Sequence, residues 1–308
     1  MKTSRSPALA CVPNSVLAIF GPTASGKSAV AEALAERVPA EIVSADSMQV
    51  YRGLPILTNQ SPARLVGIWP LDHEASVGEF QQLAHSAIDE ILAAGRTPVI
   101  VGGTGLYLRA ALADLRLPPA PKPGVREHWD ALYDDEGGEV AHAQLAEIDP
   151  EAAEAVHPND RRRVVRSLEL AGQDRQRDRL WSGKTRHPTL VFGLDVPKEV
   201  IERRLEERAK GMFAAGVREE VAAALATGIS PTAKYAHGVA DVAEHPDDEA
   251  AIEAIVARGR RLAAYQRKWM RRIPGLVSLP ADRPPGDIAD AILEVARARQ
   301  RLPAGRAG

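Results

Sequence analysis

A phosphate-binding pattern stands near the start of the chain. Residues 21–28 have the sequence GPTASGKS and match G-x-x-x-x-G-K-[S/T] at Gly21, Gly26, Lys27 and Ser28. In such a loop the glycines let backbone N–H groups turn inward, the lysine adds a positive charge, and the last hydroxyl can bind Mg²⁺. A glycine turn with an incidental lysine is the plain alternative, but a predicted strand precedes the loop and a predicted helix follows it, as the motif requires. We therefore predict that the loop binds a di- or triphosphate.

A carboxylate follows the second predicted strand. Residues 40–46 (AEIVSAD) end at Asp46, on the edge where ligands gather in an open parallel sheet. Asp46 could accept a proton from an attacking nucleophile there, or it could only close an Asx turn or cap the next turn. The third predicted strand, 97–103 (TPVIVGG), lacks the carboxylate that nucleotide hydrolases place at this point. The loop by itself therefore does not identify ATP as the ligand.

Strands alternate with helical patterns along both ends of the chain, which predicts a parallel α/β sheet. A proline-rich stretch at 115–124 leaves the sheet, and residues 125–187 have only helical patterns. We predict a P-loop (nucleoside-triphosphate-hydrolase-like) parallel sheet flanked by helices, formed by residues 1–114 and 188–308, with an inserted all-helical domain at 115–187. The further predicted strands are 15–20, 189–196 and 276–279, and the further predicted helices are 28–38, 79–95, 104–112, 198–210, 217–226, 249–272 and 285–299.

Composition excludes several classes of protein. The chain has 308 residues, 45% of them hydrophobic, a net charge of −2 and one cysteine, Cys11. This is unlike a disordered chain, a disulfide scaffold or a uniformly basic nucleic-acid coat. No run is long enough to span a bilayer and no signal-peptide core is present, so we expect a cytoplasmic monomer with no membrane partner. Basic residues are concentrated at 161–186 and 258–272, which predicts a local anion-binding face or two solvated helix faces.

Five segments in order resemble the bacterial tRNA dimethylallyltransferases of the IPP transferase family. They are GPTASGKS, SADSMQVYRGL, VGGTGLYLRAAL, HPNDRRRVVRSLEL and GLDVPKEVIERRLEERAKGMFAAGVREEV, within a resemblance that spans residues 16–269. The resemblance implies that the loop holds the diphosphate of dimethylallyl diphosphate rather than a nucleotide. It also implies that the prenyl group passes to the exocyclic amine of the adenosine 3′ of the anticodon, in tRNAs that read codons beginning with U.

The resemblance also implies roles for individual residues. Asp46 would be the general base, Thr104 would line the site beside the adenine, and Ser28 would bind Mg²⁺. The inserted domain would grip the anticodon stem. The diphosphate ligands would be Gly21, Pro22, Thr23, Ala24, Ser25, Gly26, Lys27, Ser28 and Arg260. The tRNA contacts would be Asp46, Ser47, Met48, Gln49, Thr104, Arg126, Arg162, Arg163 and Arg166.

The sequence departs from the family pattern in four places. Residues 56–62 (ILTNQSP) stand where the family usually has GTAKP, and LVGIWPLDHEASVGEF stands where it usually has a histidine-containing segment. Residues 236–241 (AHGVAD) keep Gly238 but lack the tyrosine and the base-reading polar group, and Ala264 and Tyr265 replace two basic residues. These changes leave open a catalytically weak relative that only binds tRNA. A small-molecule or nucleoside kinase, with Asp46 activating a hydroxyl, is the other alternative.

Overall fold

The computed structural model describes residues 15–117, 123–171 and 183–301, and the structural statements below concern these ranges. Within them lies a parallel five-stranded sheet in the order β2-β3-β1-β4-β5. The predicted parallel α/β fold class is confirmed. The strands are β1 (Val16–Phe20), β2 (Ala40–Ser44), β3 (Thr97–Gly102), β4 (Thr189–Asp195) and β5 (Val277–Pro280).

The central strand β1 explains why its sequence is a continuous apolar run. All five of its residues are buried, and Ile19 lies in register with Val101 of β3 on one side and Phe192 of β4 on the other. A strand covered on both faces needs apolar side chains at every position rather than at alternate ones. The phosphate loop therefore begins at the end of the central, fully buried strand of the sheet.

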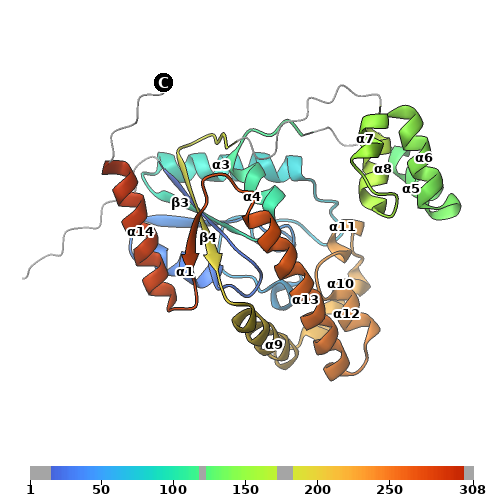
Figure 1. The fold of residues 1–308 in the computed structure, drawn as a ribbon. Coiled ribbons are helices and arrows are strands. Elements are labelled where there is room, and N and C mark those ends of the chain that lie inside the picture. The colour runs from blue at the N-terminus through green and yellow to red at the C-terminus, as the bar shows by residue number, and fades with distance from the viewer. Residues whose placement is uncertain (1–14, 118–122, 172–182, 302–308) are drawn as a thin grey trace, which may run out of the picture. The chain divides into compact units, whose positions relative to one another are not determined.

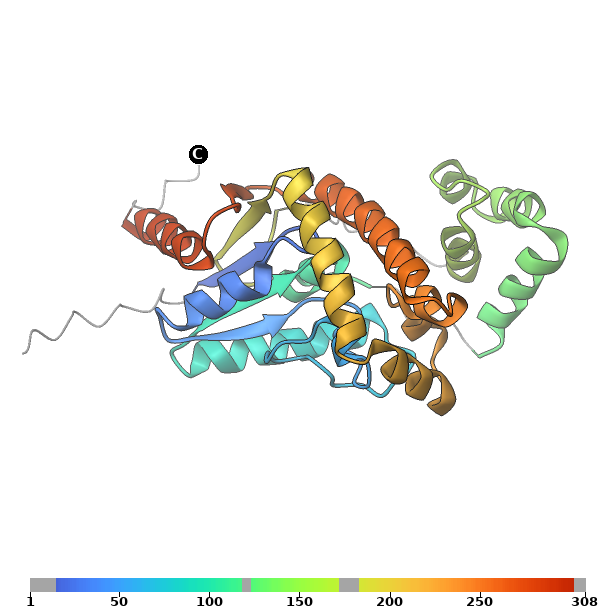
Figure 2. The ribbon, with the colours of Figure 1, turned by 90° about the horizontal axis from the view of Figure 1, so that it is seen from below.

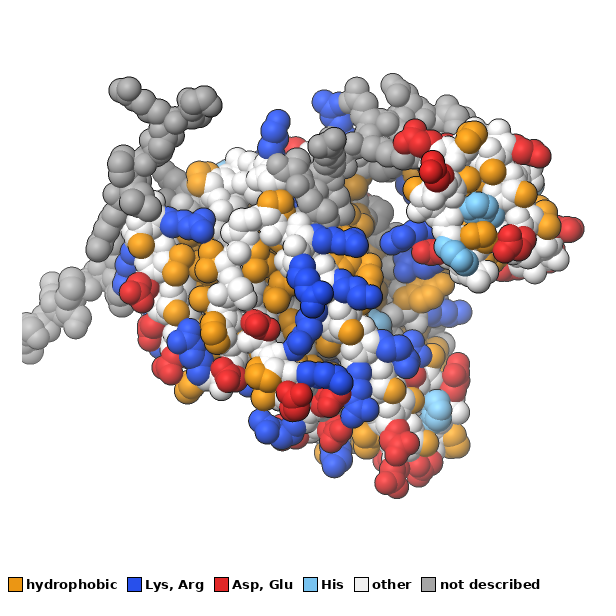
Figure 3. Space-filling view, in the orientation of Figure 1, with side chains coloured by type: hydrophobic (Ala, Val, Ile, Leu, Met, Phe, Trp, Pro, Cys, Tyr) orange, Lys and Arg blue, Asp and Glu red, His pale blue; other side chains and the backbone are white. Residues whose placement is uncertain are grey.

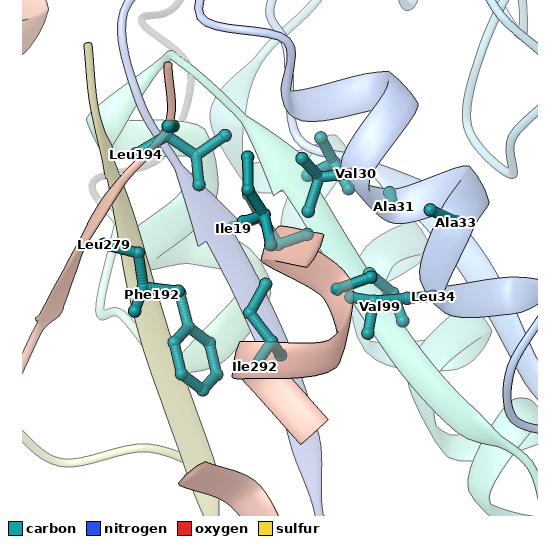
Figure 4. Close-up of a cluster of buried hydrophobic side chains, with 14 of the residues drawn as sticks. Ile19, Val30, Ala31, Ala33, Leu34, Val99, Phe192, Leu194, Leu279 and Ile292 are labelled. Atoms are coloured by element: carbon teal, nitrogen blue, oxygen red, sulfur yellow. The ribbon is translucent and has the colours of Figure 1, made fainter. Parts of the chain in front are cut away.

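Helices cover both faces of the sheet (Figures 1 and 2). Helices α1 and α14 pack against each other on one face, while α3 and α4 pack together on the opposite face. Figure 4 shows Val30 and Leu34 of α1 meeting Ile19, Val99 and Ile292 in the core between these layers. None of the described helices combines the length and the apolarity needed to cross a bilayer. The helices of this unit are α1 (Lys27–Ala35), α2 (Pro55–Thr58), α3 (Val77–Ala93), α4 (Gly105–Leu112), α9 (Lys198–Ala214), α10 (Val217–Thr227), α11 (Pro231–Lys234), α12 (Val239–Glu244), α13 (Asp248–Met270) and α14 (Pro285–Arg301).

Residues 116–179 form a second compact unit, separate in its contacts from residues 1–115 and 180–308. Its small core is built from Ala141, Leu145, Val164 and Leu168, with Trp129 packed against them. The core is apolar, while α8 is strongly basic on its other side, so the unit buries one face of each helix and exposes the other. Its helices are α5 (Val125–Glu136), α6 (Gly138–Ile148), α7 (Pro150–Glu154) and α8 (Arg161–Leu170). Residues 118–122 and 172–182, within the predicted inserted domain, lie outside the described residues.

Three glycines, one at the end of β3 and two directly after it, are required by close packing rather than by unusual backbone angles. A Cβ atom at Gly103 would overlap the side-chain amide of Gln266, and one at Gly105 would overlap the indole of Trp269. At Gly102 it would meet the backbone carbonyl of Ala45. The sequence VGGTG therefore lets α13 approach the end of β3 without any intervening side chain.

Gly105→Ala should destabilise the protein, because the added methyl group has no space beside Trp269. Overpacking of this kind costs about 1–3 kcal/mol in the free energy of unfolding. Gly211→Ala is the matched control, since Gly211 is helical with no neighbour near its Cβ position, and it should be neutral or stabilising by up to about 1 kcal/mol. Urea unfolding measures both variants. Equal free energies of unfolding for the two would contradict the packing argument.

Candidate active site

The phosphate loop has the left-handed backbone that turns N–H groups toward one point. Ala24 has φ 60° and Gly26 has φ 87°, both in the region that glycine favours, and Ala24 occupies it despite its side chain. A Cβ atom at Gly21 would lie 2.9 Å from Oγ of Ser25 and 3.2 Å from Cβ of Leu194. Successive N–H groups in such a turn at a helix start form a concave anion site. The geometry fits the predicted phosphate-binding role.

Lys27 is partly buried at the end of the loop. Its Nζ donates to the carbonyl of Pro22 at 2.7 Å. Burial lowers the pKa of Lys27 to about 8, against the opposing charge of Asp46, while the nearby Arg208 lowers it further. A partly buried ammonium of depressed pKa has lost hydration that an anion can replace. Lys27 is therefore prepared for a phosphate oxygen.

Two arginines of α9 reach the loop, and the sequence analysis did not select them. Arg208 Nη1 donates to the hydroxyl of Thr23 at 3.3 Å, and Arg204 Nη1 donates to the carbonyl of Ala24 at 3.3 Å. Burial lowers the pKa of Arg208, and its Nε has no hydrogen-bond partner within the described chain. The available signal was the four-residue spacing of these arginines on one helix face. The guanidinium of Arg208, whose buried Nε–H group is unpaired in the described chain, fits an anionic ligand.

Gln266 of α13 joins the loop to the end of β3. Its Oε1 accepts from the backbone N–H of Thr23 at 2.7 Å, and its Nε2 donates to the carbonyl of Gly103 at 3.0 Å. The side chain is 6% exposed, so both bonds are shielded from water. Gln266 therefore fixes the loop from a helix that lies far away in the sequence.

Asp46 stands where the sequence places it, at the turn after β2. Its Oδ1 accepts from the backbone N–H of Met48 at 3.0 Å, so the predicted Asx turn is present. Its charge also acts on Lys27 and Arg208, raising the pKa of each against the effect of burial. The turn and a catalytic role are compatible, because the turn uses one carboxylate oxygen.

The other predicted acceptor-side residues divide into two groups. Thr104 occupies the N-cap position of α4 but makes no side-chain cap, and its hydroxyl instead lies 3.3 Å from Oγ of Ser47. Gln49 is partly buried, and its Nε2 donates to the carbonyls of Thr58 and Asn59 at 3.2 and 3.0 Å. The structure thus brings Ser47 and Thr104 together beside Asp46, while Gln49 supports the chain around α2.

Arg260 is oriented away from the loop. Its guanidinium pairs with Glu202 at 3.6 Å and with Glu206 at 3.2 Å on α9. In this arrangement the loop is reached by Arg204 and Arg208, two and six residues after Glu202 on the same helix. A diphosphate contact by Arg260 stays a prediction.

Two predicted tRNA contacts of the helical unit meet on one buried carboxylate. Glu169 accepts from Arg126 Nε at 2.6 Å and from Arg166 Nη1 at 2.7 Å, although these arginines come from α5 and α8. Burial alone raises the pKa of Glu169, but its bonds to both arginines hold that pKa below its ordinary value. Arg162 and Arg163 are exposed on α8 beside this cluster. The unit therefore presents four arginines, two of them fixed from beneath.

The second basic tract lies on α13, where Figure 3 shows Lys and Arg side chains gathered together. Four of them are exposed and form neither an ion pair nor a side-chain hydrogen bond in the described chain, namely Arg261, Lys268, Arg271 and Arg272. Tyr265, which is 51% exposed, lies among them with its ring edge against Trp269. The replacement of a basic residue by Tyr265 thus leaves the surface around it strongly cationic.

The residues available for Mg²⁺ are few. In the described ranges no group of three His, Cys, Asp or Glu side chains could hold a metal ion. Ser28 lines a small cavity together with the polar side chains of Ser44, Gln49 and Ser61. This donor set fits Mg²⁺ only in the usual phosphate-bound manner, in which a hydroxyl and the substrate's oxygens share the ion with water.

Comparison with known proteins identifies the family. The family model described as IPP transferase matches residues 49–273, and the one described as isopentenyl transferase matches residues 14–62. The chain belongs to the IPP transferase family. A family relative named tRNA dimethylallyltransferase, from Thermobifida fusca, is 39% identical over 90% of this chain and 92% of its own. Another of that name, from Acidothermus cellulolyticus, is 39% identical over 92% of each chain.

Solved structures of IPP transferase relatives have the same fold. A tRNA isopentenylpyrophosphate transferase from Bacillus halodurans superposes with a TM-score of 0.66, at 29% identity, over 94% of this chain and all of its own. A eukaryotic dimethylallyltransferase, solved acting on tRNA, gives a TM-score of 0.76 at 24% identity over 96% of this chain and 82% of its own, which shows the fold alone. The sequence-based assignment to this family is confirmed.

Pyrophosphate should bind this family member less tightly as pH rises through the pKa of Lys27. The protonated ammonium attracts the anion, and its pKa in the free protein is about 8, so the attraction is complete below that pH and is lost above it. Bound pyrophosphate raises this pKa, so binding at about pH 8.5 takes up a proton. Calorimetry in two buffers of different ionisation heat measures the uptake. The Lys27→Met variant measures the proton exchange that comes from pyrophosphate itself. Equal proton uptake by the wild type and this variant would contradict the assignment of the uptake to Lys27.

Arg208→Met should weaken pyrophosphate binding far more than Arg260→Met. Truncation of a buried cation that contacts the ligand costs roughly thirtyfold or more in affinity. Loss of the exposed Arg260, which already has two carboxylate partners, should change affinity by less than about threefold. Direct titration with pyrophosphate ranks the two variants, and the opposite ranking would restore Arg260 as the principal ligand.

Proposed function

We propose that this chain transfers the dimethylallyl group of dimethylallyl diphosphate to the exocyclic amine of the adenosine 3′ of the anticodon in tRNA. The observation that carries the proposal is the pairing of two partly buried cations, Lys27 of the phosphate loop and Arg208 of α9, with a carboxylate, Asp46. The cations suit a leaving diphosphate and the carboxylate suits an amine that must lose a proton. The kinase alternative is not favoured, because the relatives are named as dimethylallyltransferases.

The phosphate loop would bind and stabilise the leaving diphosphate. As the bond between the allylic carbon and the diphosphate oxygen breaks, negative charge collects on the diphosphate. Inward N–H groups of the loop, together with Lys27 and Arg208, would stabilise that charge without rearrangement. Thr23, Ser25 and Ser28 add hydroxyl groups around the same anion. Mg²⁺, when bound with Ser28 as its protein ligand, neutralises further charge on the diphosphate oxygens.

The residues after β2 would orient the adenine amine, which is the nucleophile, and accept its proton. The lone pair of the adenine amine forms the new carbon–nitrogen bond, and the proton displaced from nitrogen passes to Asp46. Thr104 and Ser47, whose hydroxyl groups lie 3.3 Å apart beside Asp46, would hydrogen-bond the base. The base must leave its stack to reach them, at a cost of a few kcal/mol. Gln49, whose Nε2 donates to the carbonyls of Thr58 and Asn59, would support the segment around the entering base, and the backbone N–H of Met48 would hold the turn at Asp46.

The tRNA itself would be held by cationic surfaces of both units. Arg126, Arg162, Arg163 and Arg166 supply guanidinium groups on the helical unit, and the exposed cations of α13 supply more on the core unit. Arginine forks match phosphate oxygens well. The neutral overall charge of the chain is therefore compatible with tRNA binding, since the cations are gathered where the RNA would lie.

Asp46→Asn should lower kcat for dimethylallyl transfer by roughly a hundredfold to ten-thousandfold, the range for loss of a general base. Binding of tRNA should change little. The assay mixes protein, Mg²⁺, labelled dimethylallyl diphosphate and unmodified tRNA, and follows label in the RNA. Asp195→Asn is the matched control, because Asp195 is exposed at the carboxyl end of β4 in the same sheet, and it should retain activity. Full activity of Asp46→Asn would remove the general base from the proposal.

If the wild-type protein binds tRNA but transfers no label, the result would support the alternative that this chain only binds tRNA. Consumption of ATP in place of dimethylallyl diphosphate would support the kinase. Either result would overturn the proposed reaction.

A further inference from the structure

The short helix α2 is capped by a carboxylate from a distant helix. Its N-cap residue, Leu54, has no polar side chain, so the first N–H groups of α2 need partners from elsewhere. Glu220 of α10 supplies them, with one oxygen accepting from Ile56 at 2.9 Å and the other from Leu57 at 3.0 Å. Both oxygens of a single side chain therefore fix the start of α2.

The carbonyl of Leu57 continues this contact into the phosphate site. It accepts from Arg208 Nη2 at 3.3 Å, while Nη1 of the same guanidinium donates to Thr23 at 3.3 Å. The Nε group of Arg208 has no partner in the described part of the chain. The hydrogen bond to the Leu57 carbonyl is therefore one of two contacts within the described chain that orient the guanidinium of Arg208.

The far end of α2 is tied to the acceptor side. Gln49 donates to the carbonyls of Thr58 and Asn59, and Leu57 is 2% exposed with its side chain against the backbone of Gly238. Helix α2 thus lies between the segment that follows Asp46 and the cation that faces the phosphate loop. A shift at its start would move both.

Capping the four-residue helix α2 with Glu220 requires a charged carboxylate in a partly buried place. Burial raises the pKa of Glu220, against the two N–H bonds that lower it, which shows that its charge is held at some cost. A serine or aspartate at position 54 would satisfy the same N–H groups locally. What Glu220 adds is a connection between α2 and α10.

We propose that Glu220 is a positioning residue for the donor site, because it fixes α2 so that the carbonyl of Leu57 holds Arg208 against the phosphate loop. The inference deepens the proposed function and rests on it to the extent that Arg208 binds the diphosphate. The predicted chain of contacts runs from Glu220 through Leu57 and Arg208 to Thr23. Glu220 touches no substrate itself.

A double-mutant cycle on pyrophosphate binding tests the proposal. Glu220→Gln places an amide N–H₂ against the N–H groups of α2, so α2 loosens and pyrophosphate affinity falls roughly tenfold, a typical size for coupled neighbours. In the Arg208→Met background the same change should cost less than about twofold, because the cation that it orients is absent. Calorimetry on the wild type, both single variants and the double variant supplies the four affinities.

Glu219→Gln is the matched control, since Glu219 is the adjacent carboxylate on α10, is exposed, and makes neither a side-chain hydrogen bond nor an ion pair in the described structure. It should bind pyrophosphate like the wild type. Hydrogen exchange adds a direct readout, because Glu220→Gln should speed exchange at the amides of Ile56 and Leu57 while Arg208→Met should not. If Glu220→Gln does not fold, Glu220→Asp keeps the charge at a shorter reach and should give a smaller loss of the same pattern.

Two results would overturn the proposal. One is an equal loss of pyrophosphate affinity from Glu220→Gln with and without Arg208, which would mean a general structural effect. The other is no loss at all. The proposed reaction fails separately, if the wild type binds pyrophosphate with the predicted coupling but transfers no dimethylallyl group to tRNA.

Discussion

The rest of the site depends on two partly buried cations, Lys27 and Arg208. Lys27 and Arg208 lie beneath and beside the phosphate loop, and no ion pair within the described chain neutralises either of them. A buried charge costs free energy unless an opposite charge or strong hydrogen bonds compensate it. Asp46 reduces that cost through its field but does not remove it. These cations and the N–H groups of the loop together suit an anionic ligand.

The surrounding fold keeps those cations from relaxing toward water. Strand β1 fixes the start of the loop, Gln266 fixes Thr23, and the glycines after β3 let α13 approach closely enough for that bond. On the other side α2 holds Arg208 through a backbone carbonyl and is held in turn by Glu220 and Gln49. Preorganised charge of this kind stabilises a leaving group without the reorganisation that water requires. The same scaffold places Asp46 on the opposite, acceptor side of the site.

Much of this arrangement could be predicted from the sequence, because its signals are local. The loop, the buried strands and Asp46 at the end of β2 each follow from a few consecutive residues, and ordered motifs indicated the family. Bounds differed slightly, as where β2 ends at Ser44 because the chain turns at Asp46. Helices α2, α11 and α12 were missed, since four to six residues are too few to show a helical period.

Contacts between distant segments could not be predicted. Arg204 and Arg208 belong to an ordinary charged helix in the sequence, and only the fold turns them toward the loop, whereas Arg260 pairs with glutamates of that helix. A crystal structure with an unreactive thio analogue of dimethylallyl diphosphate tests the account most directly. We expect the diphosphate to span the N–H groups of residues 25–28, with Lys27 and Arg208 on its oxygens and the allyl group toward Asp46. Binding elsewhere, or an Arg208 that still makes no contact with the analogue, would contradict it.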